Sequence, residues 1–234
     1  MSFLDPIRAA ILDLDGTLVD TVGDFHLALH RMLEDLGAPL EAVDRAFIGR
    51  TVGKGSEYLV RRALLQVGLP GDDDRFHEHA LDRYQHHYGL INGQASEPFA
   101  GVAEGLVALR GRGWPLACLT NKPGRYAREL LAHKGLSPHF AHVFGGDEFP
   151  RKKPDPLPLI ETCRHLGLPP QQVLMVGDSV NDAQAAQAAG CPVVLMTYGY
   201  NHGQPIQEVP ALAYLDRLDD LFRPAQGGGG HARP

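Results

Sequence analysis

The sequence has few cysteines, no excess of basic residues and no long apolar run, and each shortage excludes a class of protein. The three cysteines, Cys118, Cys163 and Cys191, lie far apart and lack zinc-ligand spacing, so we expect small buried side chains in a reducing compartment and no disulfide framework. Lysine and arginine number 22 against 28 acidic residues, for a formal net charge of -6. This balance argues against nucleic acid or an anionic membrane as a partner.

The N-terminus also lacks targeting features. Residues 1–6 have neither the basic flank nor the apolar core of a signal peptide, and no apolar run approaches the length that spans a membrane. We therefore expect a cytoplasmic protein. With 234 residues, 44% of them hydrophobic, the chain is long enough for one medium domain or for a core with an inserted subdomain.

Helix and strand patterns alternate beyond Gly101, which predicts an α/β fold with a Rossmann-like parallel sheet and helices on both faces. The expected strands cover residues 9–12, 115–119, 143–144, 173–176 and 192–196, and the expected helices cover residues 102–112, 125–134, 156–166 and 182–189. Because crossovers between parallel strands are right-handed, the carboxyl ends of these strands should share one edge, where ligands bind.

Residues 21–90 carry helical patterns only, and this shift predicts an inserted all-helical cap. Its expected helices lie at about residues 21–36, 41–47, 56–67 and 73–88. We interpret Thr21 and Asp24 as the N-cap of the first helix and its third-position acid. The predicted division is an α/β core of residues 1–20 and 91–225, the cap, and a disordered glycine-rich tail of residues 226–234.

A buried strand that ends in two acids is the most informative stretch. The apolar residues 9–12 run directly into Asp13 and Asp15, and Gly16 then breaks the strand. A carboxylate this close to a core is costly unless it is paired or coordinates a metal, so both acids are candidate ligands or catalytic groups. An ordinary Asp-Gly turn is the alternative interpretation.

Polar residues follow three other predicted strands. Thr120 and Asn121 could bind phosphate oxygens, although a strand-end threonine also commonly caps a turn. Lys153 lies in a proline-rich turn before a helix and could offset the charge of an anionic ligand. Asp178 and Asp182 flank the start of a helix, where acids are also favoured by the helix dipole.

Residues 13–20, Asp-Leu-Asp-Gly-Thr-Leu-Val-Asp, resemble the first motif of the haloacid dehalogenase-like superfamily, most of whose members are phosphohydrolases. Thr120, Lys153 and residues 177–182 resemble the other three motifs in the order that the family has them, and the resemblance covers residues 8 to about 198. It implies that Asp13 is the nucleophile and that Asp15 is the general acid and base.

The resemblance also implies a magnesium ion. Asp13, Asp15 and Asp178 would supply part of its oxygen ligands. Asp182 would orient these ligands without binding the ion itself. The implied reaction is hydrolysis of a phosphate monoester through an aspartyl-phosphate, with Thr120, Asn121 and Lys153 on the phosphoryl group.

Residues 49–56 superficially resemble a nucleotide-binding Walker loop, but the glycine spacing is too short and no Ser or Thr follows the lysine. We expect instead a loop of the cap in which Gly53, Lys54 and Gly55 hold an anion; an ordinary interhelical turn is the alternative.

A helical cap with this loop looks most like those of phosphoglycolate phosphatases, which implies 2-phosphoglycolate as the substrate. A phosphosugar mutase of the β-phosphoglucomutase type, and a phosphatase for another small phosphorylated metabolite, remain the alternatives. A noncatalytic phosphate-sensing module would be expected to lack one of the motif residues, and all are present. The sequence leaves the oligomeric state open.

Overall fold

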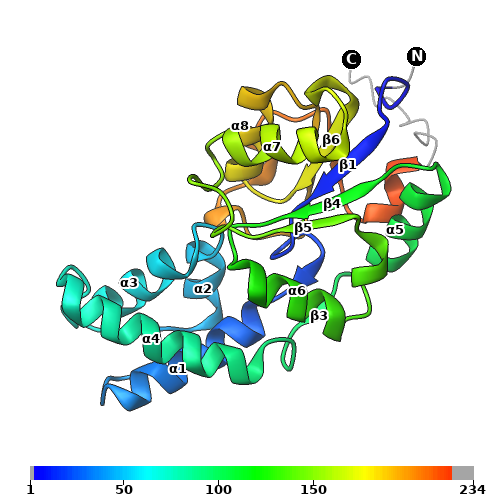
Figure 1. The fold of residues 1–234 in the computed structure, drawn as a ribbon. Coiled ribbons are helices and arrows are strands. Elements are labelled where there is room, and N and C mark those ends of the chain that lie inside the picture. Colours follow the sequence, from blue (N-terminus) through cyan, green and yellow to red (C-terminus); the bar gives the residue numbers. More distant parts are fainter. Residues whose placement is uncertain (1–2, 223–234) are drawn as a thin grey trace, which may run out of the picture.

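Six parallel strands form one sheet in the computed structural model, which describes residues 3–222 (Figure 1). The strand order is β5-β4-β1-β6-β7-β8. The strands are β1 (Ala9–Leu12), β4 (Leu116–Leu119), β5 (His142–Phe144), β6 (Val173–Gly177), β7 (Val193–Met196) and β8 (Ala213–Leu215). The predicted α/β fold is confirmed, whereas the predicted tail of residues 226–234 lies outside the described residues.

Helices cover both faces of this sheet (Figure 1). They are α5 (Val102–Gly111) and α6 (Gly124–His133) on one face, and α7 (Leu157–Leu166) and α8 (Val180–Ala189) on the other. In β1, Ala10 and Leu12 pack in the cluster of α5 and α6, while Ala9 and Ile11 pack in that of α7 and α8. A strand buried on both faces is apolar at every position, which is why β1 shows no alternation in its sequence.

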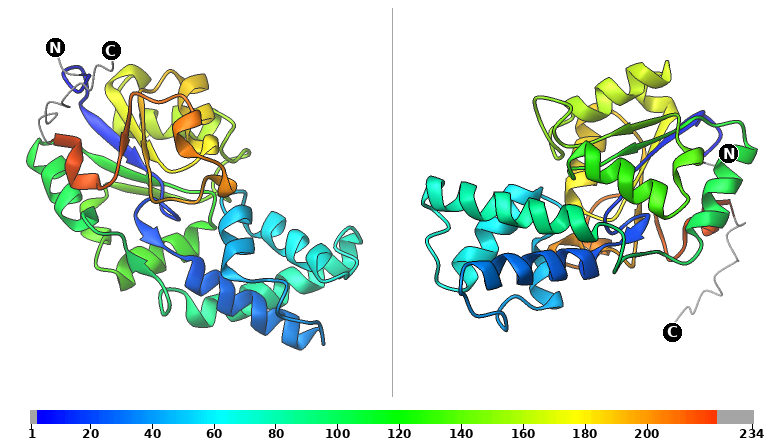
Figure 2. Two further views of the ribbon diagram at one scale, coloured as in Figure 1. Left: turned by 180° about the vertical axis from the view of Figure 1, so that it is seen from behind. Right: turned by 60° about the horizontal axis from the view of Figure 1, so that its bottom comes forward.

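Four further helices lie beside the sheet and form what we call the helical unit, residues 22–91 (Figure 2). They are α1 (Val22–Asp35), α2 (Arg45–Thr51), α3 (Ser56–Gln66) and α4 (Asp74–Ile91). Their apolar faces form a separate hydrophobic cluster, with Leu29, Leu64 and Tyr88 among its fully buried members. A burial pattern that repeats every three or four residues produces this second core.

The helical unit joins the sheet region through two short antiparallel strands, β2 (Val19–Asp20) and β3 (Glu97–Pro98). Val19 pairs with Pro98, and Asp20 pairs with Glu97. The outgoing and returning chain segments therefore lie side by side.

Two local predictions within the helical unit were wrong. The helix expected over residues 41–47 is α2, which begins at Arg45 because the carboxylate of Asp44 accepts a hydrogen bond from the Phe47 amide at 2.7 Å. The expected capping pair of Thr21 and Asp24 does not form, since the Thr21 side chain makes no capping hydrogen bond.

Asp24 instead binds the backbone of the segment that follows α4. Its two carboxylate oxygens accept hydrogen bonds from the amides of Gly93 at 2.8 Å and Ala95 at 2.7 Å. A fully buried carboxylate needs such donors, because two backbone hydrogen bonds replace the water that it has lost.

The remaining elements are short. Within residues 3–222, five short 3₁₀ helices cover Ser137–His139, Pro170–Gln172, Asn201–Gly203, Ile206–Glu208 and Leu218–Phe222. All three cysteines are free and buried, which agrees with their predicted role as small core side chains.

Candidate active site

The sheet topology brings the predicted motif residues to one edge. β1 lies between β4 and β6, and Asp13, Thr120 and Asp178 each directly follow the carboxyl end of one of these three strands. All three side chains are almost completely buried. Parallel neighbouring strands end together, so residues more than a hundred positions apart meet at the same rim.

Three carboxylates form an acidic cluster at this rim. One oxygen each of Asp13, Asp178 and Asp182 lie within 4.8 Å of one another. The ammonium of Lys153 neutralises part of this charge: its Nζ is 3.0 Å from Asp13 Oδ1 and 2.7 Å from Asp182 Oδ1. It also donates a hydrogen bond to the Leu119 carbonyl at 2.8 Å, which fixes its position against the end of β4.

Asn121 holds the turn that carries Lys153. Its amide nitrogen donates to the Lys153 carbonyl at 2.8 Å, and its carbonyl oxygen accepts from the Lys153 amide at 3.0 Å. The same nitrogen donates to the Gly53 carbonyl at 2.9 Å. Asn121 therefore has a structural role that the sequence did not indicate, and its contact with a substrate stays a prediction.

Both oxygens of Asp182 are engaged by the protein. Oδ1 pairs with Lys153, and Oδ2 accepts hydrogen bonds from the Ser179 hydroxyl at 2.7 Å and from the amides of Asp178 and Ser179 at 3.2 and 3.1 Å. This arrangement caps α8 and orients the loop that carries Asp178. Asp182 is therefore fully buried and held by Lys153 and the start of α8, whereas the side chain of Asp13 remains 12% exposed.

Burial and mutual repulsion make this cluster electrostatically costly. Burial raises the pKa of Asp13 to about 7; Lys153 opposes the rise, and the charges of Asp182 and Asp15 add to it. Burial, followed by repulsion from Asp182 and Asp13, raises the pKa of Asp178 well above its usual range. Burial lowers the pKa of Lys153, but attraction to Asp13 and Asp182 outweighs it, and the net pKa is raised. A cation between Asp13 and Asp178 would relieve this repulsion.

Two hydrogen bonds aim Asp178 at the cluster. Oδ1 accepts from the Thr17 hydroxyl at 2.8 Å, and Oδ2 accepts from the Tyr200 amide at 2.8 Å. The Tyr200 hydroxyl also donates to Asp20 Oδ1 at 2.8 Å. Sequence analysis missed Tyr200, because it lies in the loop after β7 and carries no motif of its own.

Asp15 lies outside the acidic cluster and has a partner that sequence analysis also missed. Its Oδ1 is 2.7 Å from the ammonium of Lys122, and both side chains are nearly buried. The Lys122 ammonium lies over the rings of Phe25 and Tyr88, 4.4 and 4.9 Å from their centroids. The Asp15 carboxylate is thus paired with Lys122 in this arrangement, and the metal role of Asp15 stays a prediction. A lysine two residues beyond a strand-end threonine was the available signal for Lys122.

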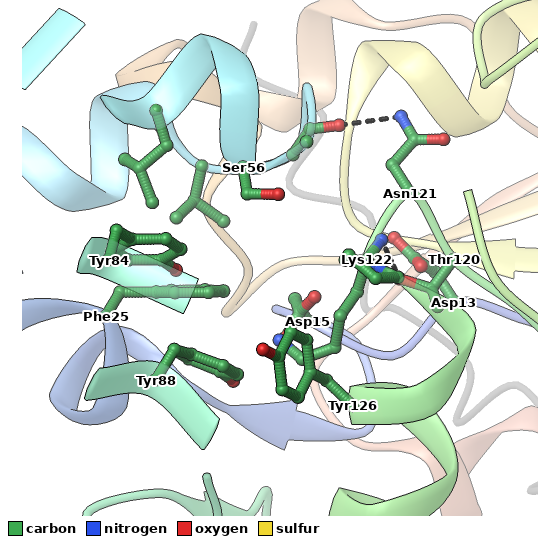
Figure 3. Close-up of a pocket in the computed structure, with 15 residues that line it drawn as sticks. Asp13, Asp15, Phe25, Ser56, Tyr84, Tyr88, Thr120, Asn121, Lys122 and Tyr126 are labelled. Atoms are coloured by element: carbon green, nitrogen blue, oxygen red, sulfur yellow. Dashed lines mark hydrogen bonds and ion pairs between the residues drawn. The ribbon is translucent and has the colours of Figure 1, made fainter. Parts of the chain in front are cut away.

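A cavity lies between the sheet edge and the helical unit (Figure 3). Phe25, Tyr84 and Tyr88 of the helical unit line one side, and Asp13, Thr120 and Lys122 line the other. The other residues that line it are Asp15, Val52, Gly53, Gly55, Ser56, Leu59, Asn121, Pro123 and Tyr126. The arrangement places an apolar aromatic wall opposite a charged one.

The glycine loop of the helical unit contributes to this cavity in part. Gly53 and Gly55 line it, and the Gly53 carbonyl accepts a further hydrogen bond from Asn181 at 3.2 Å. Lys54 does not line it: its side chain is exposed, and its ammonium lies 5.1 Å from the centroid of the Tyr58 ring. Anion binding by Lys54 stays a prediction.

This combination of a parallel sheet, buried acids at its carboxyl edge and a lysine beside them defines a class of hydrolase. Residues 7–190 match the sequence profile described as haloacid dehalogenase-like hydrolase, and the chain belongs to this family. The predicted resemblance is confirmed. Within residues 3–222, no helix is both long and apolar enough to cross a membrane.

The relatives that share most of the chain's length carry a more specific name. A phosphoglycolate phosphatase from Thiobacillus denitrificans is 42% identical over 217 residues, which cover 93% of this chain and 95% of the relative. One from Nitrosospira multiformis is 41% identical over 222 residues, with the same coverage. The crystal structure of a predicted phosphoglycolate phosphatase from Haemophilus somnus superimposes with a TM-score of 0.86 at 32% identity, covering 92% of this chain and 96% of that one.

Proposed function

We propose that the protein is a magnesium-dependent phosphate monoester hydrolase that converts 2-phosphoglycolate to glycolate and phosphate. The observation that carries this proposal is the convergence of Asp13, Asp178 and Lys153, with Nζ of the lysine 3.0 Å from Asp13 Oδ1. The names of relatives at 41% and 42% identity support the choice of substrate. The three free thiols are in keeping with the cytoplasm as the site of action.

The donor set fits a magnesium ion. Asp13 and Asp178 offer hard oxygen ligands. Burial raises the pKa of both because it disfavours their charged forms, and a bound divalent cation would stabilise these charged forms. We assign the Asp15 backbone carbonyl as a third protein ligand, since its carboxylate is paired with Lys122. When bound, the cation would supply charge neutralisation for the phosphoryl oxygens.

The chain's own residues can then divide the reaction between them. A carboxylate oxygen of Asp13 forms a bond to phosphorus while the bond between phosphorus and the ester oxygen breaks, and Asp15 gives a proton to the departing alkoxide. Asp15 next takes a proton from a water molecule, whose oxygen attacks phosphorus and releases Asp13 and phosphate. Lys153 and Thr120 hold the phosphoryl oxygens, and Asp182 keeps Lys153 and the Asp178 loop in place.

We further propose that residues 21–90 act as a cap that closes the site from water. In support, α1, α3 and α4 contribute Phe25, Leu59, Tyr84 and Tyr88 to the cavity wall, and Gly53 is hydrogen-bonded to the sheet edge. In this account Gly53 and Gly55, which line the cavity, face the part of the substrate that is not phosphate. Anion binding by Lys54 would require a change in its side-chain conformation.

Steady-state rates on a panel of small phosphate esters test the proposal. The panel contains 2-phosphoglycolate, glycerol phosphates and hexose phosphates, and both phosphate release and sugar isomerisation are followed. We expect the highest kcat/KM for 2-phosphoglycolate, and no turnover by Asp13→Asn, whose fold is checked by circular dichroism. Isomerisation without phosphate release would identify a phosphosugar mutase, and retained turnover by Asp13→Asn would exclude the covalent mechanism.

A further inference from the structure

The cavity contains a buried positive charge that the proposed chemistry does not use. Among the described residues that line the cavity, Lys122 is the only one with a positively charged side chain. Its side chain is 3% exposed, and its ammonium pairs with Asp15. A lysine that only neutralised one carboxylate could do so from the surface, at far smaller cost in desolvation.

The helical unit encloses this ammonium. The rings of Phe25 from α1 and Tyr88 from α4 lie beneath it, with centroids 4.4 and 4.9 Å away. Aromatic faces stabilise a cation without consuming its hydrogen-bond donors. An ammonium has three donors, and the Asp15 carboxylate is the hydrogen-bond acceptor that the structure gives it.

Unsatisfied hydroxyl groups lie in the same cavity wall. Ser56 and Tyr88 both line the cavity, and their buried hydroxyl oxygens have no hydrogen-bond partner. Buried hydroxyl groups normally find a partner, so these two indicate a polar ligand group that completes them. A cation with spare donors and two free hydroxyls is a suitable environment for a carboxylate.

We propose that Lys122, assisted by the hydroxyls of Ser56 and Tyr88, binds the carboxylate of the substrate and so selects small phosphorylated carboxylic acids. The inference rests on the proposed phosphatase function. In 2-phosphoglycolate, the carboxylate carbon is two covalent bonds from the ester oxygen. A side chain that protonates this oxygen therefore lies beside the carboxylate, and Lys122 is bound directly to that side chain, Asp15. Lys54, predicted from the sequence to bind an anion, does not line the cavity, and its ammonium lies 5.1 Å from the centroid of the Tyr58 ring.

Two substrates separate this role from other roles of Lys122. 2-Phosphoglycolate carries the carboxylate, and ethyl phosphate has the same phosphoryl group but no carboxylate. For Lys122→Met we expect KM for 2-phosphoglycolate to rise by roughly 10- to 150-fold, the loss expected for a hydrogen bond to a charged group. KM for ethyl phosphate should change several-fold less. The same comparison for Lys54→Met tests the competing lysine, and Lys134→Met, whose lysine is absent from the cavity wall, controls for a change of charge.

Each outcome has one meaning. If the wild type fails to hydrolyse 2-phosphoglycolate, the proposed function is wrong. If the wild type hydrolyses it and Lys122→Met lowers kcat for both substrates equally, Lys122 positions Asp15 and the inference is overturned. It is also overturned if Lys54→Met, and not Lys122→Met, loses the preference for the carboxylate.

A second variant keeps the test valid if Lys122→Met does not fold. Tyr88→Phe removes one hydroxyl and leaves the pair of Lys122 and Asp15 intact. We expect it to raise KM for 2-phosphoglycolate several-fold more than KM for ethyl phosphate. Equal effects on the two substrates would contradict the inference.

Discussion

The charge on Asp13 should destabilise the metal-free fold at neutral pH, and its removal should stabilise that fold. Burial raises the pKa of Asp13 from 3.8 to about 7. Between these two values the folded chain holds a proton that the unfolded chain has released. This contribution to stability is therefore complete below pH 3.8 and is lost as the pH rises through 7.

The size of the effect follows from the shift. One proton of difference changes the free energy of unfolding by about 1.4 kcal/mol per pH unit, which sets an upper limit of about 4 kcal/mol over roughly three units. Relaxation around a buried charge reduces this limit, and we expect about 2 kcal/mol at pH 8. For a chain of this length, that corresponds to a difference in Tm of about 4 to 8 °C.

Thermal unfolding in EDTA, with wild type and Asp13→Asn compared at each half unit from pH 4 to pH 8, measures the effect. The wild type should lose stability relative to the variant as the pH rises, because only the wild type must release the proton. Added Mg²⁺ should then stabilise the wild type more than the variant. A difference between the two proteins that does not change with pH, or one of opposite sign, would refute the electrostatic account of the cluster.

Three other predictions concern the same framework. Lys153→Met should abolish turnover and lower the free energy of unfolding by about 3 to 5 kcal/mol, because the carboxylates of Asp13 and Asp182 lose their buried partner. Steady-state kinetics and urea unfolding measure the two effects. Gly23→Ala should destabilise the junction with the helical unit, because the added Cβ would lie 2.0 Å from the Ala95 carbonyl oxygen. The matched variant Gly49→Ala, whose Cβ meets nothing within 4 Å, should leave the stability unchanged. Thermal unfolding of the two variants compares these effects. EDTA should abolish turnover and Mg²⁺ should restore it, with an unchanged circular dichroism spectrum; undiminished turnover of a verified metal-free protein would exclude the metal role of Asp13 and Asp178.

The parts of the site that the sequence predicted share one property: each is tied to a short local pattern. Asp13 ends an apolar run, and Lys153 lies between a strand and a proline-bounded turn, so neighbouring residues indicate what each does. The alternation of strand and helix then supplies the parallel topology that brings them together.

The missed parts depend on partners far away in the sequence. Asp24 has the spacing of a helix-capping acid, yet its donors are the amides of Gly93 and Ala95, about 70 residues later. The ammonium of Lys122 packs against the rings of Phe25 and Tyr88, which lie near opposite ends of the helical unit in the sequence. No local sequence pattern predicts such contacts, because they form only when distant segments pack together in the fold.

The ladder of β2 and β3 has a consequence for how new specificities could arise in this fold. Asp20 and Glu97 are paired neighbours, so the intervening 76 residues begin and end at almost the same point in space. A different module with closely spaced ends could replace them without altering the order or register of the sheet. The cavity wall that Phe25, Leu59, Tyr84 and Tyr88 form could thus be exchanged as one insertion, while the residues at the sheet edge, Lys122 among them, stay in place.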